Sequence, residues 1–163
     1  MAKLSLREGD LFEMVMPDGR FGYGQIIVSK KIMYVVIFEG LYAFRPVLDD
    51  IPFTKILFVG WTMDALIYHG EWKIIGNRPI SPSVPYSRYQ VEISGRTHIT
   101  DFLGDAIRVA SDSDANFYDR RSSYSPIIFQ RALAGRYGLG EYQGPQQITF
   151  EYVKMRSASE NVH

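Results

Sequence analysis

The sequence predicts an α+β fold, in which a curved and mostly antiparallel sheet is packed by one main C-terminal helix and a short helix. Aromatic residues make up 14% of the chain, and such side chains suit a pleated, half-buried surface. Strand-length apolar segments separated by Gly and Pro fill the first half, whereas a helical pattern follows Ser125. With 163 residues, we expect a single domain over residues 1–154 and a disordered tail over 155–163.

Residues 10–38 are predicted to form a three-stranded meander. Between the first two strands, Pro17-Asp18-Gly19 supplies a tight turn, since proline presets φ and glycine accepts the left-handed conformation. Gly22 and Gly24 mark where the second strand can bend sharply. Residues 32–38 are apolar at every position, which predicts a central strand covered on both faces.

The remaining predicted elements are shorter. Thr62 is expected to cap a short helix that runs through Tyr68. The main helix is expected to begin at Ser125-Pro126, with the serine as cap and the proline at the first helical position. Residues 111–124 are polar and are predicted to be a loop. Further strands are expected over residues 56–59, 72–75, 89–93, one or two segments of 96–110, and 148–153.

Composition excludes several classes of protein. The formal net charge is zero, which disfavours a general nucleic-acid binder, so no direct nucleic-acid partner is expected. There are no cysteines, and so neither disulfides nor thiol chemistry is available. The first ten residues lack the apolar run of a signal peptide. No segment approaches the roughly 18 apolar residues of a membrane span. We therefore expect a cytoplasmic protein without a membrane partner.

Motifs that would indicate catalysis or metal binding are incomplete. The stretch from Asp112 to Asn116 begins like a calcium loop. However, Phe117 and Ser123 stand where that loop needs a glycine and a bidentate glutamate. The three histidines form no close ligand pair, and no serine-nucleophile elbow is present. The sequence therefore predicts neither an enzyme nor a bound cofactor or metal.

Three segments carry a family resemblance: residues 9–25, residues 64–79 and residues 129–142. The second reads Asp64-Ala-Leu-Ile-Tyr-His-Gly-Glu-Trp-Lys-Ile-Ile-Gly-Asn-Arg-Pro79. In this order they resemble the immunity protein 26 family of bacterial polymorphic-toxin systems. The resemblance implies a protein that binds and neutralises a cognate toxin, with nucleases among the toxins of such systems. Its signature positions here, interpreted as structural, are Gly19, Gly24, Trp72, Gly76 and Pro79.

The stretch from Asp101 to Tyr124 is rich in Asp, Tyr and Arg, and the loop from Asp112 to Tyr124 within it is predicted to belong to the partner contact surface. Tyr and Arg are enriched at interface hot spots, and acidic groups steer association with basic partners. The proposed contact residues are Asp112, Asp114, Tyr118, Asp119, Arg120, Arg121 and Tyr124. An ordinary polar loop explains the same composition. The alternative function is a small β-rich ligand- or nucleic-acid-binding module, in which Phe21, Tyr23 and Tyr34 would stack on bases from exposed sheet faces.

Overall fold

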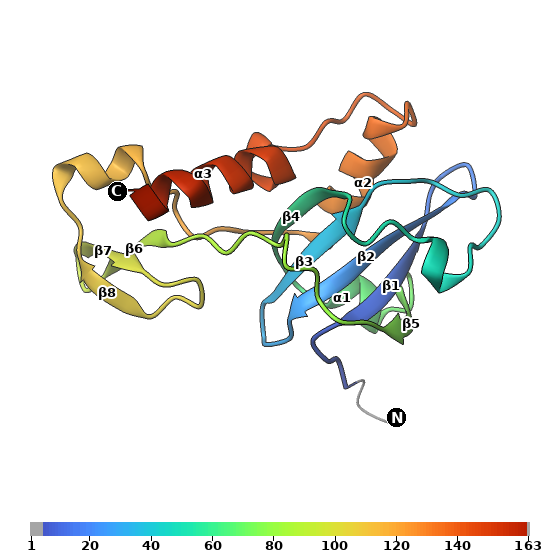
Figure 1. Cartoon of the computed structure of the whole chain (residues 1–163), viewed down its shortest axis with the longest axis horizontal. Coiled ribbons are helices and arrows are strands. Elements are labelled where there is room, and N and C mark those ends of the chain that lie inside the picture. Colours follow the sequence, from blue (N-terminus) through green and yellow to red (C-terminus); the bar gives the residue numbers. More distant parts are fainter. Residues whose placement is uncertain (1–4, 163) are drawn as a thin grey trace. The chain divides into compact units, whose positions relative to one another are not determined.

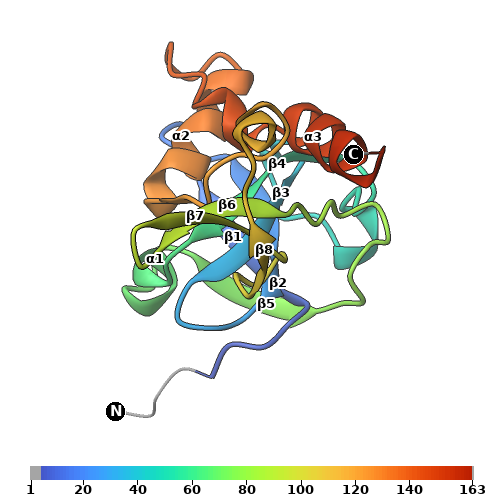
Figure 2. The same cartoon turned by 90° about the vertical axis from the view of Figure 1, so that its left-hand side faces the viewer.

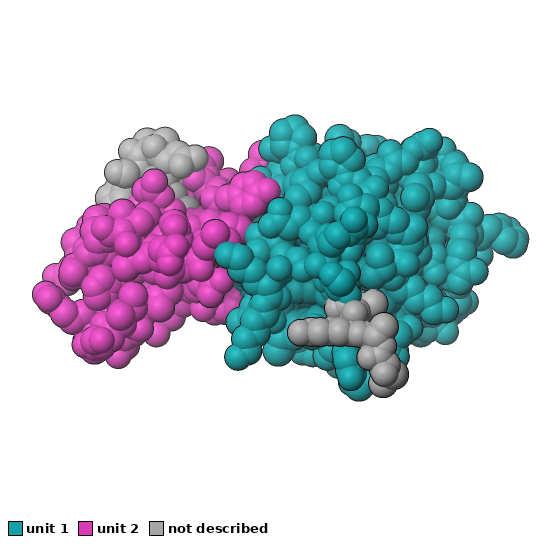
Figure 3. Space-filling model, turned by 90° about the horizontal axis from the view of Figure 1, so that it is seen from below, with its two compact units in different colours: residues 1–84, 123–149 teal, residues 85–122, 150–163 magenta. Residues whose placement is uncertain are grey.

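A computed structural model describes residues 5–162, with side chains to residue 158, and the chain divides into two compact units (Figures 1 and 3). Unit 1 comprises residues Met1–Val84 and Ser123–Thr149, and unit 2 comprises Pro85–Ser122 and Phe150–His163. The expectation of one domain over residues 1–154 stays a prediction. The α+β class is confirmed: both units hold largely antiparallel sheets together with helices.

Unit 1 is built on a six-stranded sheet of order β5-β1-β2-β3-β4-β9 (Figure 1). All its neighbouring pairs are antiparallel except β4 with β9, which is parallel. The strands are β1 (Asp10–Val15), β2 (Phe21–Val28), β3 (Met33–Phe38), β4 (Ile56–Thr62), β5 (Lys73–Asn77) and β9 (Ser123–Tyr124). The helical segments are η1 (Leu48–Asp50), α1 (Ala65–Tyr68), α2 (Pro126–Arg136) and η3 (Gln146–Ile148).

The predicted meander is present as β1, β2 and β3. At the first turn the Met16 N–H donates to the Arg20 carbonyl at 2.8 Å, and Gly19 has φ +86°. Glycine is needed there because L side chains rarely adopt that conformation. β3 lies between β2 and β4 and is buried at every position, which confirms the predicted central strand.

The core of unit 1 lies between this sheet and α2, which packs on one face through Phe129 and Leu133 (Figure 2). Trp72 is 1% exposed and stacks on Phe12, with ring centroids 4.5 Å apart. A β-carbon at Gly24 would lie 2.7 Å from the Val36 carbonyl oxygen. Gly24 therefore serves close packing of neighbouring strands, which the sequence interpretation as a bend did not anticipate.

The aromatic residues of the base-stacking hypothesis are not available for stacking. Tyr23 and Tyr34 are buried. Phe21 is half-buried, and the Arg45 guanidinium lies 4.5 Å from its ring centroid. Because β3 and its neighbours are covered on both faces, the tyrosines belong to the core. This correction removes the observation that favoured a nucleic-acid-binding module.

Two predicted caps differ from the structure. The short helix begins after Asp64, whereas Thr62 ends β4 and its hydroxyl donates to the Tyr124 carbonyl at 2.7 Å. That bond helps hold β9, which the sequence had placed in a loop. Pro126 is the first residue of α2 as predicted, and Ser125 holds the N-cap position without a side-chain capping bond.

Unit 2 contains a three-stranded antiparallel sheet of order β6-β7-β8. Its elements are β6 (Tyr89–Ile93), β7 (Arg96–Thr100), β8 (Ala106–Val109), η2 (Asp112–Asn116) and α3 (Phe150–Val162). Residues 96–110, where one or two strands were expected, hold two, β7 and β8. Among the described residues, no helix has the length and apolar character needed to cross a membrane.

The C-terminal prediction was wrong in its secondary structure. Residues 148–153, expected as a strand, form the end of η3 and the start of α3, and the helix continues through Val162 where a frayed tail was expected. His163 lies outside the described residues. The segment is rich in Lys, Met, Arg, Ala and Glu, all good helix formers. Arg156 also anchors it, donating to the Asn116 carbonyl at 2.7 Å and to Asp119 at 2.8 Å.

Candidate partner interface

Asp114, one of the predicted contact residues, is 1% exposed. Its carboxylate accepts two hydrogen bonds from the Arg108 guanidinium, at 2.7 and 2.9 Å. It also accepts from the Ser111 N–H at 2.6 Å and the Ser111 hydroxyl at 3.0 Å. The Arg108 guanidinium holds the pKa of Asp114 well below its usual range, against the opposing effect of burial. Asp114 therefore joins η2 to β8.

Three other predicted contact residues are also engaged within their own units. Tyr118 is 2% exposed, and its carbonyl accepts from Gln90 at 2.6 Å. Asp119 is half-buried and pairs with Arg156. Tyr124 lies in β9 and is half-buried. Tyr118 is thus enclosed by unit 2, whereas Asp119 and Tyr124 are partly exposed and stay candidate contacts.

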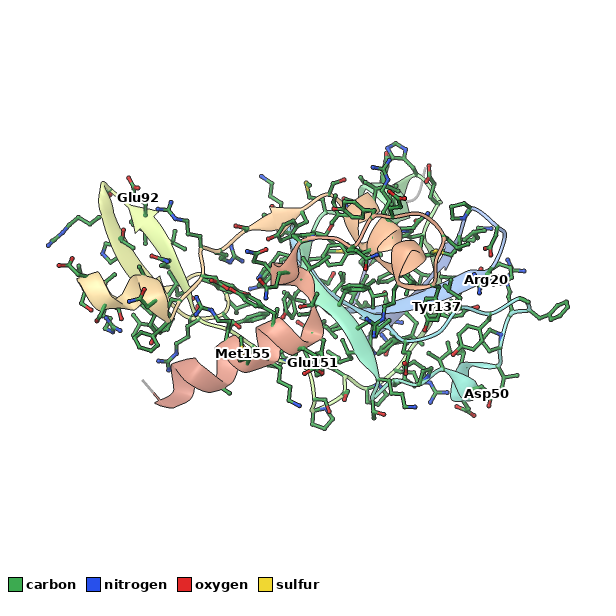
Figure 4. The ribbon with its side chains drawn as sticks, turned by 90° about the horizontal axis from the view of Figure 1, so that it is seen from above. Arg20, Asp50, Glu92, Tyr137, Glu151 and Met155 are labelled. Carbon is green, nitrogen blue, oxygen red and sulfur yellow. The ribbon has the colours of Figure 1, made fainter. Side chains whose placement is uncertain are left out.

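The remaining predicted residues are more accessible. Asp112 and Arg120 are exposed, and Arg121 is half-buried. Both arginines line a shallow recess beside β6, whose other residues are Gln90, Val91, Glu92 and Thr97. Glu92 projects from β6 (Figure 4). Because this recess mixes acidic and basic groups, it carries no single sign of charge. Asp112, Arg120 and Arg121 stay candidate contacts.

Unit 1 carries a second candidate surface, the loop from Glu39 to Asp50 (the 39–50 loop), which the sequence did not single out. Phe44 is 87% exposed, the highest value among the exposed large apolar residues of the described chain, and Val47 is 66% exposed. Solitary exposed apolar residues are common on protein surfaces. Here two of them lie three residues apart on one loop.

The start of the 39–50 loop is fixed to β2. The Phe21 N–H donates to the Tyr42 carbonyl at 2.8 Å, and the Tyr42 N–H donates to the Phe21 carbonyl at 2.9 Å. The Gly40 N–H donates to the Tyr137 hydroxyl at 2.7 Å, tying the loop to the end of α2. These bonds join segments far apart in sequence, so the loop leaves the sheet in a defined direction.

The middle of the loop is fixed by a buried carboxylate. Glu13 is 3% exposed and accepts from the Arg45 Nε at 3.1 Å and from the Tyr23 hydroxyl at 2.9 Å. Burial, reinforced by the bond to Glu13, raises the pKa of Tyr23 well above its usual value. The tyrosine therefore stays protonated and a donor. Arg45 is the only cationic residue of the loop, and it forms an ion pair with Glu13.

The end of the loop is the turn η1. The Asp50 N–H donates to the Val47 carbonyl at 3.0 Å, and Asp49 forms an ion pair with Arg78. The Asp50 side chain lies at the periphery of unit 1 (Figure 4) and is in no ion pair with a described residue. Burial raises the pKa of Tyr42, and the negative charges of Asp50 and Glu39 contribute to the shift.

The chain offers little for metal chemistry in its described part, where no group of three His, Cys, Asp or Glu side chains is placed to hold a metal ion. Among the signature positions, Trp72 and Gly76 contact other elements of unit 1. The Trp72 indole N–H donates to the Gln130 side chain at 2.8 Å, which joins the residue just before β5 to α2. Gly76 lies against Leu48 of η1, and Pro79 is exposed just after β5.

The family model of immunity protein 26 matches residues 7–99. The chain belongs to this family. The matched region of the immunity protein 26 member spans β1 through most of β7 and includes the 39–50 loop. It excludes the predicted contact residues from Asp112 to Tyr124. No curated protein and no solved structure matches the chain.

Proposed function

We propose that this protein binds a cognate bacterial toxin domain and neutralises it by stoichiometric association, without catalysis of its own. The supporting observation is the match of the immunity protein 26 model to residues 7–99. The protein acts in the cytoplasm of the cell that makes the toxin, as a member of a polymorphic toxin system. The target is a toxin such as a nuclease, whose active site the bound protein covers or distorts.

The physical demand on such a protein is tight binding. A nanomolar dissociation constant corresponds to about −12 kcal/mol and is reached by interfaces of roughly 1,600 Å² when their anchors are well packed. A preorganised surface lowers the entropic cost of association. The 39–50 loop, fixed at its start, middle and end by the contacts of Tyr42, Arg45 and Asp49, is of this kind. These features are compatible with inhibition by association alone.

Co-expression tests the proposal. The product of the gene adjacent to this protein's gene is expressed in bacteria, alone and together with this protein, and growth and co-purification are measured. We expect the toxin to stop growth, this protein to restore it, and the two to co-purify at a fixed ratio. A Leu133→Asp variant, which places a carboxylate at a fully buried position, provides a misfolded control. Growth arrest that the wild-type protein does not relieve would contradict the proposed function.

A nucleic-acid substrate assay tests the narrower statement about the toxin. The purified toxin is incubated with double-stranded DNA and with RNA, with increasing amounts of this protein. Cleavage that ends at an equimolar ratio supports a nuclease target. A toxin that is neutralised but cleaves neither substrate leaves the immunity function in place and removes the nuclease assignment.

A further inference from the structure

We propose that the 39–50 loop is the surface with which this protein docks on its toxin, Phe44 filling an apolar recess that is bordered by basic side chains. The inference rests on the proposed function and deepens it by naming the surface and the chemistry of the partner. This surface differs from the loop Asp112–Tyr124 predicted from the sequence, in which Asp114 and Tyr118 are buried.

Phe44 is the main apolar residue of the proposed docking surface. With 87% of its surface exposed, the ring gains little from the fold of unit 1. Val47, 66% exposed and three residues further on, extends the same apolar surface. Aromatic side chains that enter a partner's pocket dominate many interfaces, because they bury a large area with few rotatable bonds. Phe44 is thus available in full to a partner.

The 39–50 loop is held in place around Phe44. Phe44 lies between two residues that are held by hydrogen bonds. The backbone N–H and carbonyl of Tyr42 both pair with the backbone of Phe21, and the Arg45 guanidinium donates to the buried Glu13 carboxylate. The Arg45 guanidinium also lies over the Phe21 ring at 4.5 Å. The backbone on both sides of Phe44 is therefore held before binding, and little ordering entropy is lost on association.

The charged residues of the 39–50 loop indicate the chemistry of the partner. The loop holds three carboxylates, Glu39, Asp49 and Asp50, and one guanidinium, Arg45. Glu39 pairs with Lys55 at 4.0 Å, Asp49 pairs with Arg78, and Arg45 pairs with Glu13 of β1. Asp50 is therefore the one carboxylate of the loop without an ion pair to a described residue. Acidic surfaces associate fastest with basic ones. In a two-fold pair of this chain, equivalent acidic loops would meet, which disfavours a second copy as occupant.

The apolar contact is tested by comparing two exposed aromatic residues. Phe44→Ala and Tyr68→Ala each remove a ring, and Tyr68 is 67% exposed on α1. Binding to the purified toxin is measured by surface plasmon resonance, and the Trp fluorescence spectrum confirms that both variants fold. We expect Phe44→Ala to raise the dissociation constant at least 30-fold, as for an interface hot spot. Tyr68→Ala should change it less than threefold, because that ring lies outside the loop.

The charge contribution is tested with a second matched pair. Asp50→Lys reverses an acid of the loop, and Asp64→Lys reverses an exposed acid that makes no capping bond at the start of α1. We expect the association rate of Asp50→Lys to fall about tenfold at low salt and the difference to shrink at high salt, as steering by exposed charges predicts. Asp64→Lys should retain the wild-type rate.

The outcomes separate this inference from the proposed function. If wild-type protein protects cells and Phe44→Ala binds as tightly as wild type, the loop is not the docking surface and the immunity function stands. A wild-type protein that neither protects nor binds overturns both the function and the occupant. Concentration-dependent dimerisation that Phe44→Ala abolishes, without a change in toxin affinity, would assign the surface to a second copy and overturn the inference.

Discussion

Replacing Asp114 by Asn should loosen unit 2 without disturbing unit 1. The wild-type carboxylate accepts four hydrogen bonds, two from Arg108 and two from Ser111. An amide keeps only one accepting atom and turns a donor group toward donors. The change removes the buried negative charge, keeps the shape of the side chain, and so isolates the electrostatic contribution.

The size of the effect follows from burial on the two sides of the pair. Asp114 is 1% exposed, whereas the Arg108 side chain is 44% exposed and can recover hydration. Breaking a buried ion pair costs about 3–5 kcal/mol when the remaining charge is trapped. Ser111 is an exposed residue, so its N–H can also return to water. Because Arg108 can return to water, we expect Asp114→Asn to lower the stability of unit 2 by about 3 kcal/mol, the low end of that range.

Hydrogen exchange is the suitable assay because Trp61 and Trp72 both lie in unit 1 and Trp fluorescence therefore reports only that unit. A loss of about 3 kcal/mol corresponds to roughly 150-fold faster exchange of the protected amides in residues 106–118, at tenfold per 1.36 kcal/mol. The control is Asp112→Asn in the same turn, where the side chain is exposed. Its exchange should match wild type.

The pH dependence follows from the direction of the pKa shift. The pKa of Asp114 in the folded protein is held below its ordinary value by Arg108. Its contribution is therefore complete above the unfolded pKa near 4 and is lost as pH falls from about 4 toward the folded value. Protection of residues 106–118 should decline over that window in wild type and not in Asp114→Asn. Equal exchange in Asp114→Asn and Asp112→Asn at neutral pH would refute the reasoning.

Two further substitutions test unit 1 by urea unfolding followed by Trp fluorescence. Gly24→Ala places a β-carbon 2.7 Å from the Val36 carbonyl oxygen, and should destabilise by about 1–3 kcal/mol through overpacking; an unchanged midpoint would show that the strands can separate. Arg45→Met leaves buried Glu13 with fewer partners and should cost about 1–2 kcal/mol, whereas Arg20→Met, which removes an exposed ion pair, should stay within about 0.5 kcal/mol.

Much of unit 1 could be predicted because its signals are local. The turn at Pro17-Asp18-Gly19 fixes how β1 and β2 pair, and an apolar strand without alternation can only be central, as β3 is. The hairpin of β6 and β7 had a similar signal in Ser94-Gly95, both at positive φ between the paired residues Ile93 and Arg96. That dipeptide is typical of a two-residue hairpin, and the sequence analysis did not use it.

The C-terminal error has a different cause. Over residues 148–153 the apolar positions alternate well enough to suggest a strand, and the helical preference appears only when the window extends beyond Met155. The contacts that anchor α3 come from Asn116 and Asp119, which lie 40 and 37 residues away from Arg156. Such distant contacts cannot be read from the helix's own sequence.

The two candidate surfaces show why residue type alone does not locate partner contacts. Acidic residues are usually exposed and aromatic residues usually buried, but here Asp114 is buried and Phe44 is exposed. The Asp114 carboxylate has hydrogen-bond partners because β8 places Arg108 beside it. The exposure of Phe44 depends on how β2 holds the loop at Tyr42. Exposure must therefore be known before composition indicates binding. On that reasoning Phe44 is the first side chain to remove when a toxin is in hand.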